Sequence, residues 1–497
     1  MSGIRVTYSG LISFSLGLTK IITGLVFMTI VTRLLSAEEF GTWTLINGIL
    51  FYGIVLDPII SYWSTREIAR NKNFGKTAFA GEGLLSIGGI IIYFISVLII
   101  VPQTNIEYNV LLFAVILIPP MYLNKVLSSI NAGWKPQTVS YANFFSEIIK
   151  IPLILLFIFY FDMGVIGVII AYFIGWIIND LALLWYARGK IRDKLNMEIF
   201  KKWMKIFWLS LYPRIAPLIE RSDVILFTLI TGSVIGLAYY SSALIIGGLV
   251  GFAGAFSAPV YGKLLGDGKK EYLSNNLTLQ IYLMVLLSGL SIIFAKIGLF
   301  TLNPIYQIAV PIVIIITIRI FFQTLNLLFV QILTGLENVD VKNEPTFKEY
   351  IKSKLVFVPT IKVIQAGMYI TLLTFVLIFM TNKVSEIELV QIWTLVALII
   401  EIPFTLILFL FARKNVKLLF ESSRIIKFIL SGIIVFTMTY IITEKYITYK
   451  NEIISFIPHL LIFIMIGISG YLIITGIIDK KIGNLYKSIF HEIKKSM

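Results

Sequence analysis

The stretch Tyr212-Pro-Arg-Ile-Ala-Pro-Leu-Ile-Glu-Arg-Ser-Asp223 lies inside residues 206–231, which otherwise have the length and apolar character of a membrane-spanning helix. A charge at the bilayer centre costs about 2.5–3.5 kcal/mol on insertion scales, so charged residues in spans usually face a bundle interior or a water-filled cavity. Arg214 and Arg221 are two helical turns apart on one face, and the two prolines each remove a backbone donor and weaken the helix. We therefore expect a bendable span that presents positive charge to a hydrated interior.

An alternative for this stretch is structural. Glu220, Arg221 and Asp223 are close enough in the sequence to neutralise one another as a local cluster.

The composition is that of a polytopic membrane protein. Of the 497 residues, 58% are apolar and 14% charged, whereas soluble domains contain about 45–50% apolar and about 25% charged residues. The chain has no cysteine and two histidines, too few for thiolate chemistry or a histidine metal site. No phosphate-cradling Walker motif is present, so we expect no direct use of ATP. We also expect no cofactor, no metal and no enzyme activity.

Apolar runs of about 20 residues recur along the chain and predict an all-α protein of about fourteen transmembrane helices. The predicted spans are 9–32, 40–61, 80–101, 109–131, 141–161, 164–187, 206–231, 234–260, 273–297, 304–334, 355–381, 388–412, 425–443 and 453–477.

The distribution of basic residues supports this count. The net charge of +15 would suggest a nucleic-acid partner in a soluble protein. With the N-terminus in the cytoplasm, however, about thirty of the 42 lysines and arginines fall in inner segments and about five in outer ones. We therefore predict cytoplasmic N- and C-termini, no nucleic-acid partner and a multi-pass location in the cell membrane.

Two short similarities suggest an internal duplication. Phe40-Gly-Thr-Trp and Ile235-Gly-Leu-Ala each open a predicted span, and Ile130-Asn-Ala-Gly-Trp and Ile332-Leu-Thr-Gly-Leu each close one. Both offsets correspond to six predicted helices, and an even number of crossings preserves orientation, so the halves would be parallel repeats. The predicted domains are an N-terminal lobe (1–205), a C-terminal lobe (206–424) and two additional spans with an amphipathic cytoplasmic tail (425–497).

Further charged and polar residues fall inside the spans. Lys20 and Arg319 are predicted, with Arg214 and Arg221, to line a cavity between the lobes. Gln323 and Asn326 follow Arg319 on one helical face and are predicted as polar cavity lining. Glu401 is buried in its span without an obvious partner.

Other charges have simpler interpretations. Glu147 and Lys150 are one turn apart and are expected to form a local ion pair. Lys125 and Asp180 lie near helix ends, where snorkelling to the interface is the default expectation. Asp57, before Pro58, is expected to mark a helix terminus.

Two segments have a predicted packing role. Gly247, Gly248, Gly251, Gly254 and Ala255 have the spacing that lets a neighbouring helix approach closely. The tail 480–495 places Ile482, Leu485, Ile489 and Ile493 on one face, which favours a position along the inner leaflet; the alternative is a helix that only solubilises the end.

Three further stretches follow predicted spans: Thr32-Arg-Leu-Leu-Ser-Ala-Glu-Glu-Phe-Gly-Thr-Trp43, Ser64-Thr-Arg-Glu-Ile-Ala-Arg70 and Asn131-Ala-Gly-Trp-Lys135. In these stretches the chain resembles flippases of the polysaccharide-transporter family, which belongs to the superfamily of multidrug, oligosaccharidyl-lipid and polysaccharide exporters. The resemblance implies alternating access by two lobes and translocation of a polyprenyl-(di)phosphate-linked oligosaccharide to the outer leaflet for surface polysaccharide or glycan biosynthesis. Membrane lipids and glycan-assembly enzymes are the further partners it suggests.

The predicted cavity cations Lys20, Arg214, Arg221 and Arg319 suit a diphosphate headgroup, because arginine binds phosphate oxygens bidentately. Glu220, Asp223 and Glu401 are predicted as sites for a coupled ion because of their depth in the membrane.

Three other functions remain open. A multidrug or cation antiporter of the same superfamily would be expected to have twelve spans and an acidic cavity. A membrane glycan polymerase or ligase would need a large outer loop, and the predicted outer loops are short. A scaffold for a glycan-assembly complex would have no need of buried cations.

Overall fold

The computed structural model describes residues 23–487, apart from 70–72, 105, 136, 193, 257–263, 265–272, 338, 340–346, 417–420 and 451. All regular structure in these residues is helical. The chain forms two compact units: unit 1 runs up to Ser241 and includes Ala366–Leu389, and unit 2 comprises Ser242–Gln365 and the chain from Val390 onward. This division into compact units does not test whether the chain contains a sequence duplication. The predicted repeats and their boundaries therefore stay predictions.

The described residues contain eleven helices that are long and apolar enough to cross a membrane, or twelve if one bent pair counts as a span. This confirms the all-α polytopic architecture, but it does not confirm the count of fourteen. Two predicted spans differ from a single long helix: the second is bent and the seventh is broken. Of the first predicted span, the described part is in the helix Thr23–Leu34.

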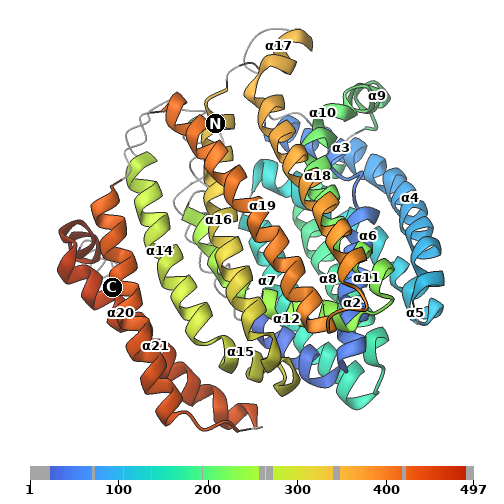
Figure 1. Cartoon of the computed structure of the whole chain (residues 1–497). Coiled ribbons are helices and arrows are strands. Elements are labelled where there is room, and N and C mark those ends of the chain that lie inside the picture. Colours follow the sequence, from blue (N-terminus) through green and yellow to red (C-terminus); the bar gives the residue numbers. More distant parts are fainter. Residues whose placement is uncertain are drawn as a thin grey trace. The chain divides into compact units, whose positions relative to one another are not determined.

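Unit 1 is built from the N-terminal helices (Figure 1). They are α2 (Ala37–Gly53), α3 (Pro58–Ala69), α4 (Gly75–Ile100), α5 (Tyr108–Phe113), α6 (Ile118–Trp134), α7 (Gln137–Ile154), α8 (Gly164–Ile191), α9 (Met197–Lys205), α10 (Phe207–Leu211), η4 (Tyr212–Arg214), α11 (Ile215–Thr231) and the start of α12 (Ile235–Gly247). Helix α6 lies at the centre, against α3, α4 and α8 (Figure 1).

The break between α2 and α3 is encoded by Asp57-Pro58. Proline is favoured in the first turn of a helix because its missing donor is not needed there, and the two helices meet at 65°. The prediction that Asp57 marks a helix terminus is confirmed: its carbonyl accepts from the N–H groups of Ile60 and Ser61. The bend leaves the carbonyl of Gly53 to a side-chain donor, the hydroxyl of Tyr122 at 2.9 Å. The break is therefore a satisfied feature of the span.

The predicted seventh span is broken at Pro213, whereas Pro217 lies in the first turn of α11. Helix α10 gives way to the 3-10 turn η4, which contains Pro213, and α11 then begins at Ile215. Helix α11 ends at Gly232, whose φ of +69° is the left-handed conformation that glycine adopts without steric cost. Arg214 consequently projects from a turn and not from a continuous helix.

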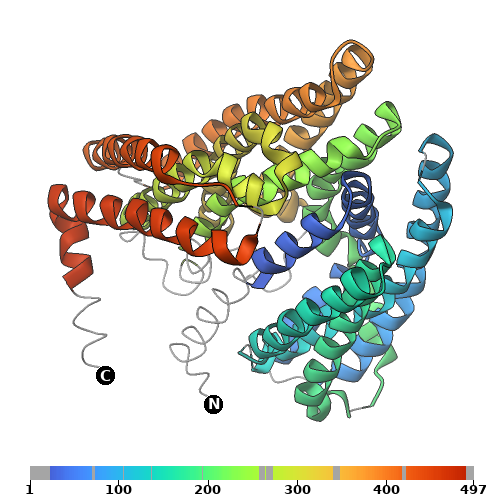
Figure 2. The ribbon, with the colours of Figure 1, turned by 90° about the horizontal axis from the view of Figure 1, so that it is seen from below.

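Unit 2 contains the remaining helices: η5 (Gly248–Phe256), α14 (Leu273–Ile293), α15 (Ala295–Leu302), η6 (Pro304–Ala309), α16 (Val310–Gly335), α17 (Phe347–Lys352), most of α19 (Glu386–Asn415), α20 (Ser422–Tyr446), α21 (Ile453–Ile478) and the first part of α18 (Lys354–Met380). Helix α14 lies against η5, α16, α20 and α21, and Figure 2 shows α20 and α21, the orange-red and red helices, side by side. A cluster of Tyr282, Phe428, Phe436 and Tyr471 fills the space between α14, α20 and α21.

The predicted packing role is confirmed for three of the small residues, but not for Gly248, where a Cβ would meet nothing within 4 Å. A Cβ at Gly247 would lie 2.9 Å from Ile316, and those at Gly251 and Gly254 would lie 3.6 Å from side chains of α16. The absence of a side chain at these glycines lets α12 and η5 approach α16 closely.

The tail follows α21 and packs in part on the protein. Ile482 is fully buried in the aromatic cluster of unit 2, and Tyr486 reaches the hydroxyl of Tyr282. The prediction that Ile482 faces the inner leaflet is therefore wrong, because this side chain is used for packing. Leu485 is exposed, whereas Ile489 and Ile493 lie outside the described residues.

An ionic network joins α20 to the segment after α21. Arg424 donates from Nε to Oδ2 of Asp479 at 2.6 Å and also pairs with Glu421. Lys481 donates to Glu421 at 2.8 Å. Hydrogen bonds from Lys481 and then Arg424 hold the pKa of Glu421 below its ordinary value. Burial acts to raise the pKa of Asp479, but hydrogen bonds from Arg424 outweigh it and the pKa is lowered.

This network predicts a pH-dependent contribution to stability. Because both carboxyl groups have lowered pKa values in the folded protein, their contribution is present above about pH 4, the ordinary range, and is lost as the pH falls through the lower folded values. We expect the melting temperature to fall more steeply between about pH 6 and about pH 3 in the wild type than in Arg424→Gln. Lys296→Gln, which removes the exposed pair with Glu444, is the control and should follow the wild type. Equal slopes for Arg424→Gln and the wild type would contradict the role of the network.

A second prediction concerns the contact of α2 with the residue before α12, where a Cβ at Gly41 would lie 1.9 Å from the carbonyl oxygen of Val234. We expect Gly41→Ala to lower the free energy of unfolding by about 1–3 kcal/mol through overpacking. A Cβ at Gly83 on α4 would meet nothing within 4 Å, so Gly83→Ala should be neutral or stabilising by up to about 1 kcal/mol. Thermal unfolding in detergent compares the two, and equal melting temperatures would contradict the close approach.

Candidate functional site

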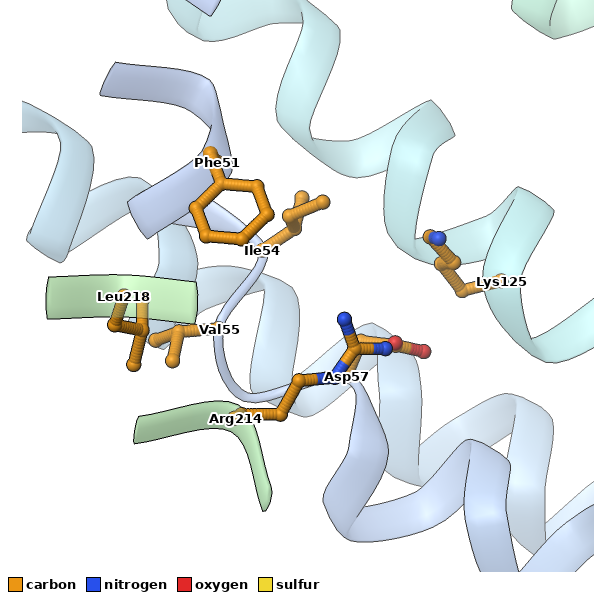
Figure 3. A pocket seen from close by; sticks show the side chains of 7 residues that line it. All are labelled: Phe51, Ile54, Val55, Asp57, Lys125, Arg214 and Leu218. Carbon is orange, nitrogen blue, oxygen red and sulfur yellow. The ribbon is translucent and has the colours of Figure 1, made fainter. Parts of the chain in front are cut away.

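The candidate site is a pocket in unit 1 whose lining comes from α2, α6, η4, α11 and the linker between α2 and α3 (Figure 3). It is lined by Phe51, Ile54, Val55, Asp57, Lys125, Arg214 and Leu218. Its volume is about 20 Å³, which holds roughly one water molecule. Arg214 extends from η4 toward Asp57, and Lys125 reaches in from α6 (Figure 3).

The two cations of this pocket are not neutralised by contact. Among the described residues, neither Arg214 nor Lys125 forms an ion pair within 4 Å or a side-chain hydrogen bond. Arg214 is exposed and Lys125 is half-buried. Lys125 was expected to snorkel to the membrane interface, but its side chain lines the pocket instead. Both charges are thus available to a ligand.

Arg221 lies on α11, the helix that contributes Leu218 to the pocket. Its guanidinium carbon is 5.6 Å from the centre of the Phe51 ring, so the ring that lines the pocket also faces this cation. Within the described chain Arg221 forms no ion pair, which is not what the interpretation as a neutralised cluster with Glu220 and Asp223 predicts. The adjacent Tyr52 hydroxyl donates to the carbonyl of Leu218 at 2.6 Å and fixes α11 against α2.

The predicted coupling acids of this segment differ in environment. Asp223 is 5% exposed and accepts hydrogen bonds from the Tyr369 hydroxyl at 2.7 Å and from the N–H of Val224 at 2.8 Å. Glu220 is half-buried. The contact of Asp223 with Tyr369, 146 residues away, was not predictable from the sequence.

Unit 2 contains a separate chain of polar side chains. Glu401 accepts from Asn326 at 3.0 Å and from Gln365 at 2.7 Å, and Gln365 in turn accepts from Lys362 at 2.9 Å. The sequence-based view that Glu401 lacks a partner is therefore wrong. Sequence reasoning missed Gln365, although its spacing from Lys362 is that of helical neighbours.

The residues of the polar stripe predicted on α16 differ in exposure. Gln323 is exposed, Asn326 is buried against Glu401, and Arg319 is half-buried. Lys20 lies outside the described residues. The role of these residues as cavity lining stays a prediction.

A second pocket of unit 1, of about 50 Å³, lies between α7 and α8. Its cation is neutralised: Lys150 is 2.9 Å from Glu147 and 4.8 Å from the centre of the Tyr172 ring. The predicted local pair is confirmed, and its burial indicates a structural role.

Unit 1 contains two further buried acids, Asp180 and Glu82. Asp180, expected to snorkel, is instead buried and accepts from Asn124 of α6 at 2.9 Å. Glu82 on α4, which sequence reasoning missed, is 0% exposed. The available signal was a single acid at the start of a long apolar run. Among the described residues, no group of three or more His, Cys, Asp or Glu forms a metal site.

No protein-family model matches the sequence, and no curated protein matches it. In three dimensions, the chain is similar to the lipid II flippase MurJ in an inward closed conformation, with a TM-score of 0.65 and 17% identity over 95% of this chain and 99% of the other. An inward-facing multidrug resistance MATE family transporter of the MOP superfamily has a TM-score of 0.56 and 16% identity, over 82% and 97% of the two chains. An outward-facing MATE family transporter of the same superfamily has a TM-score of 0.55 and 14% identity, over 83% of this chain and 94% of the other.

The chain shares the fold of these solved proteins. This confirms the predicted fold and shows that it is shared with solved transporters and a flippase, which are similar to this chain in structure at low sequence identity.

The hydrogen bonds of Glu401 lead to a stability prediction for unit 2. We expect Glu401→Leu to leave the amide of Gln365 without an acceptor and to leave that of Asn326 only the Thr405 hydroxyl at 3.4 Å, at about 1–3 kcal/mol for each unsatisfied group. Glu401→Gln keeps one acceptor oxygen and should cost about half as much. Thermal unfolding of both variants measures this, and equal losses would show that the hydrogen bonds do not stabilise the unit.

Proposed function

We propose that this protein is a flippase of the cell membrane that moves a polyprenyl-(di)phosphate-linked oligosaccharide from the cytoplasmic to the outer leaflet by alternating access. The observation that supports it best is the pocket of Arg214 and Lys125, whose charges are not neutralised by contact with described residues. The fold, shared with a solved lipid II flippase, supports the same class of substrate.

The chemistry of the pocket suits a phosphate headgroup. A diphosphate carries about two negative charges, and arginine binds phosphate oxygens with two parallel N–H groups. Arg221, over the ring of Phe51, supplies a further cation on the same helix. An inside-negative potential favours outward movement of an anion by about 2.3 kcal/mol per charge per 100 mV.

The pocket is smaller than the headgroup that we propose for it. Its volume of about 20 Å³ holds a water molecule, so the headgroup would be admitted in another conformation of the transport cycle. The breaks at Asp57-Pro58 and at η4 are the elements of unit 1 that could change shape, because each already interrupts a helix.

A cation antiporter is less well supported. Two of the three charged groups that line the pocket are basic, and a net positive pocket disfavours a cationic drug. Glycan-assembly enzymes are partners that this function would imply.

The proposal is tested by reconstituting the protein in vesicles and following a fluorescent polyprenyl-diphosphate oligosaccharide between leaflets. We expect Arg214→Gln and Arg221→Gln each to reduce transport by roughly ten- to a hundredfold, since a hydrogen bond to a charged group is worth about 1.5–3 kcal/mol. Lys383→Gln, which removes one positive charge outside the pocket, is the matched control. Transport that is unchanged in both arginine variants, with normal folding, would refute the proposal.

A further inference from the structure

The feature with no role so far is a pair of buried carboxyl groups beside the pocket. Glu82 of α4 is 0% exposed and Asp57 is 3% exposed. Both carboxylate oxygens of Glu82, and Oδ1 of Asp57, are buried and accept no hydrogen bond of normal geometry from the part of the chain that is described. A buried ionised carboxylate without donors is costly, so these oxygens require an explanation.

Asp57 lies between α2 and α3, both of which pack on α4, and its carboxyl group is near enough to that of Glu82 for the two to interact electrostatically. An ionised carboxylate can only accept, whereas a protonated one also donates. The interaction is therefore favourable when one of the two groups carries a proton. When both are ionised, it joins two like charges in a low-dielectric interior, where one carboxyl of such a pair normally retains its proton.

The other groups around the pair do not remove this requirement. Lys125 of α6 attracts Glu82, and the backbone N–H of Ser61 in α3 lies near it but is donated to the carbonyl of Asp57. The Tyr122 hydroxyl of α6 is used by Gly53. On α8, which also packs on α4, the carboxylate of Asp180 accepts from Asn124. Arg214 of η4 lines the pocket on the side of Asp57 (Figure 3).

We propose that Asp57 and Glu82 form a proton-binding site in which the two carboxyl groups share one exchangeable proton. Its occupation switches the adjoining pocket of Lys125 and Arg214 into an anion-binding state. The second part rests on the proposed function, and the first does not.

The coupling follows from the charges. With one proton bound, the carboxyl pair carries a single negative charge, which offsets Lys125 and leaves Arg214 to attract an anion. Without the proton, the two carboxylates offset both cations, and the pocket loses its attraction for phosphate. Linkage is reciprocal, so binding of an anion also promotes uptake of the proton. Substrate and proton thus bind cooperatively.

The switch is tested by measuring the affinity of the purified full chain in lipid nanodiscs for farnesyl diphosphate between about pH 6 and about pH 9, the range that buried carboxyl pairs can reach. We expect the wild type to lose affinity at high pH by at least about fivefold relative to Glu82→Gln. Glutamine stays neutral and donates to Asp57, so this variant should keep the high affinity. Glu147→Gln, which alters the neutralised pair in the second pocket, should behave as the wild type. The same pH dependence in the wild type and Glu82→Gln would overturn the switch.

The proton itself is tested without a ligand, by infrared spectroscopy at neutral pH. We expect the C=O stretching band of a protonated carboxylic acid in the wild type to be reduced in Glu82→Gln and, as a second variant, in Asp57→Asn. Spectra that superpose would overturn the proton site. Failure of the wild type to bind farnesyl diphosphate at any pH would refute the switch and count against the proposed function. The infrared difference would then still decide whether the proton site exists.

Discussion

A polar or charged group inside a membrane has to find its partner within the protein, because lipid supplies neither donors nor counter-charges. This requirement accounts for the buried contacts of both units. In unit 1, Asp180 accepts from Asn124 and Asp223 from Tyr369. In unit 2, Glu401 accepts from two amide side chains. Each contact joins helices that are far apart in the sequence, so partner satisfaction and helix packing are the same event.

The same requirement determines where helices can break. An interruption frees backbone groups that must be bonded elsewhere, and the break before Pro58 is possible because Tyr122 donates to the carbonyl of Gly53. The break at η4 places Arg214 on a turn, where its long side chain reaches the pocket. Proline supplies the interruption in both cases, and the position of a pocket cation is its consequence. The helical breaks of unit 1 therefore build the site as well as interrupt its spans.

Hydrophobic run length and charge position in the sequence were sufficient to predict the helical architecture, because each depends on nearby residues alone. They also located the stretch that carries Arg214 and Arg221. They were not sufficient to count the spans, since a hydropathy window does not distinguish a straight helix from one bent at Asp57-Pro58. Nor could they pair Glu401 with Gln365 or find the interaction of Glu82 with Asp57, which depend on how helices rotate about their axes. Asp180 and Lys125 were misjudged for the same reason: a position near a helix end is compatible with a contact to protein or to water.

The two pockets of unit 1 show how the placement of an acid determines what a buried cation can do. Lys150 is in contact with Glu147 at 2.9 Å, and at such a distance the attraction is several kcal/mol even at an effective dielectric constant of about 20. An incoming anion would have to displace that carboxylate, so this lysine is committed to structure. Lys125 and Arg214 have acids nearby but no ion pair within 4 Å among the described residues. Because Coulomb attraction falls with distance, these acids reduce the cost of holding the cations in the membrane without occupying their donors. An anion site inside a bilayer needs this intermediate arrangement: isolated cations would be too costly when the site is empty, and fully paired cations would have nothing left to offer a phosphate.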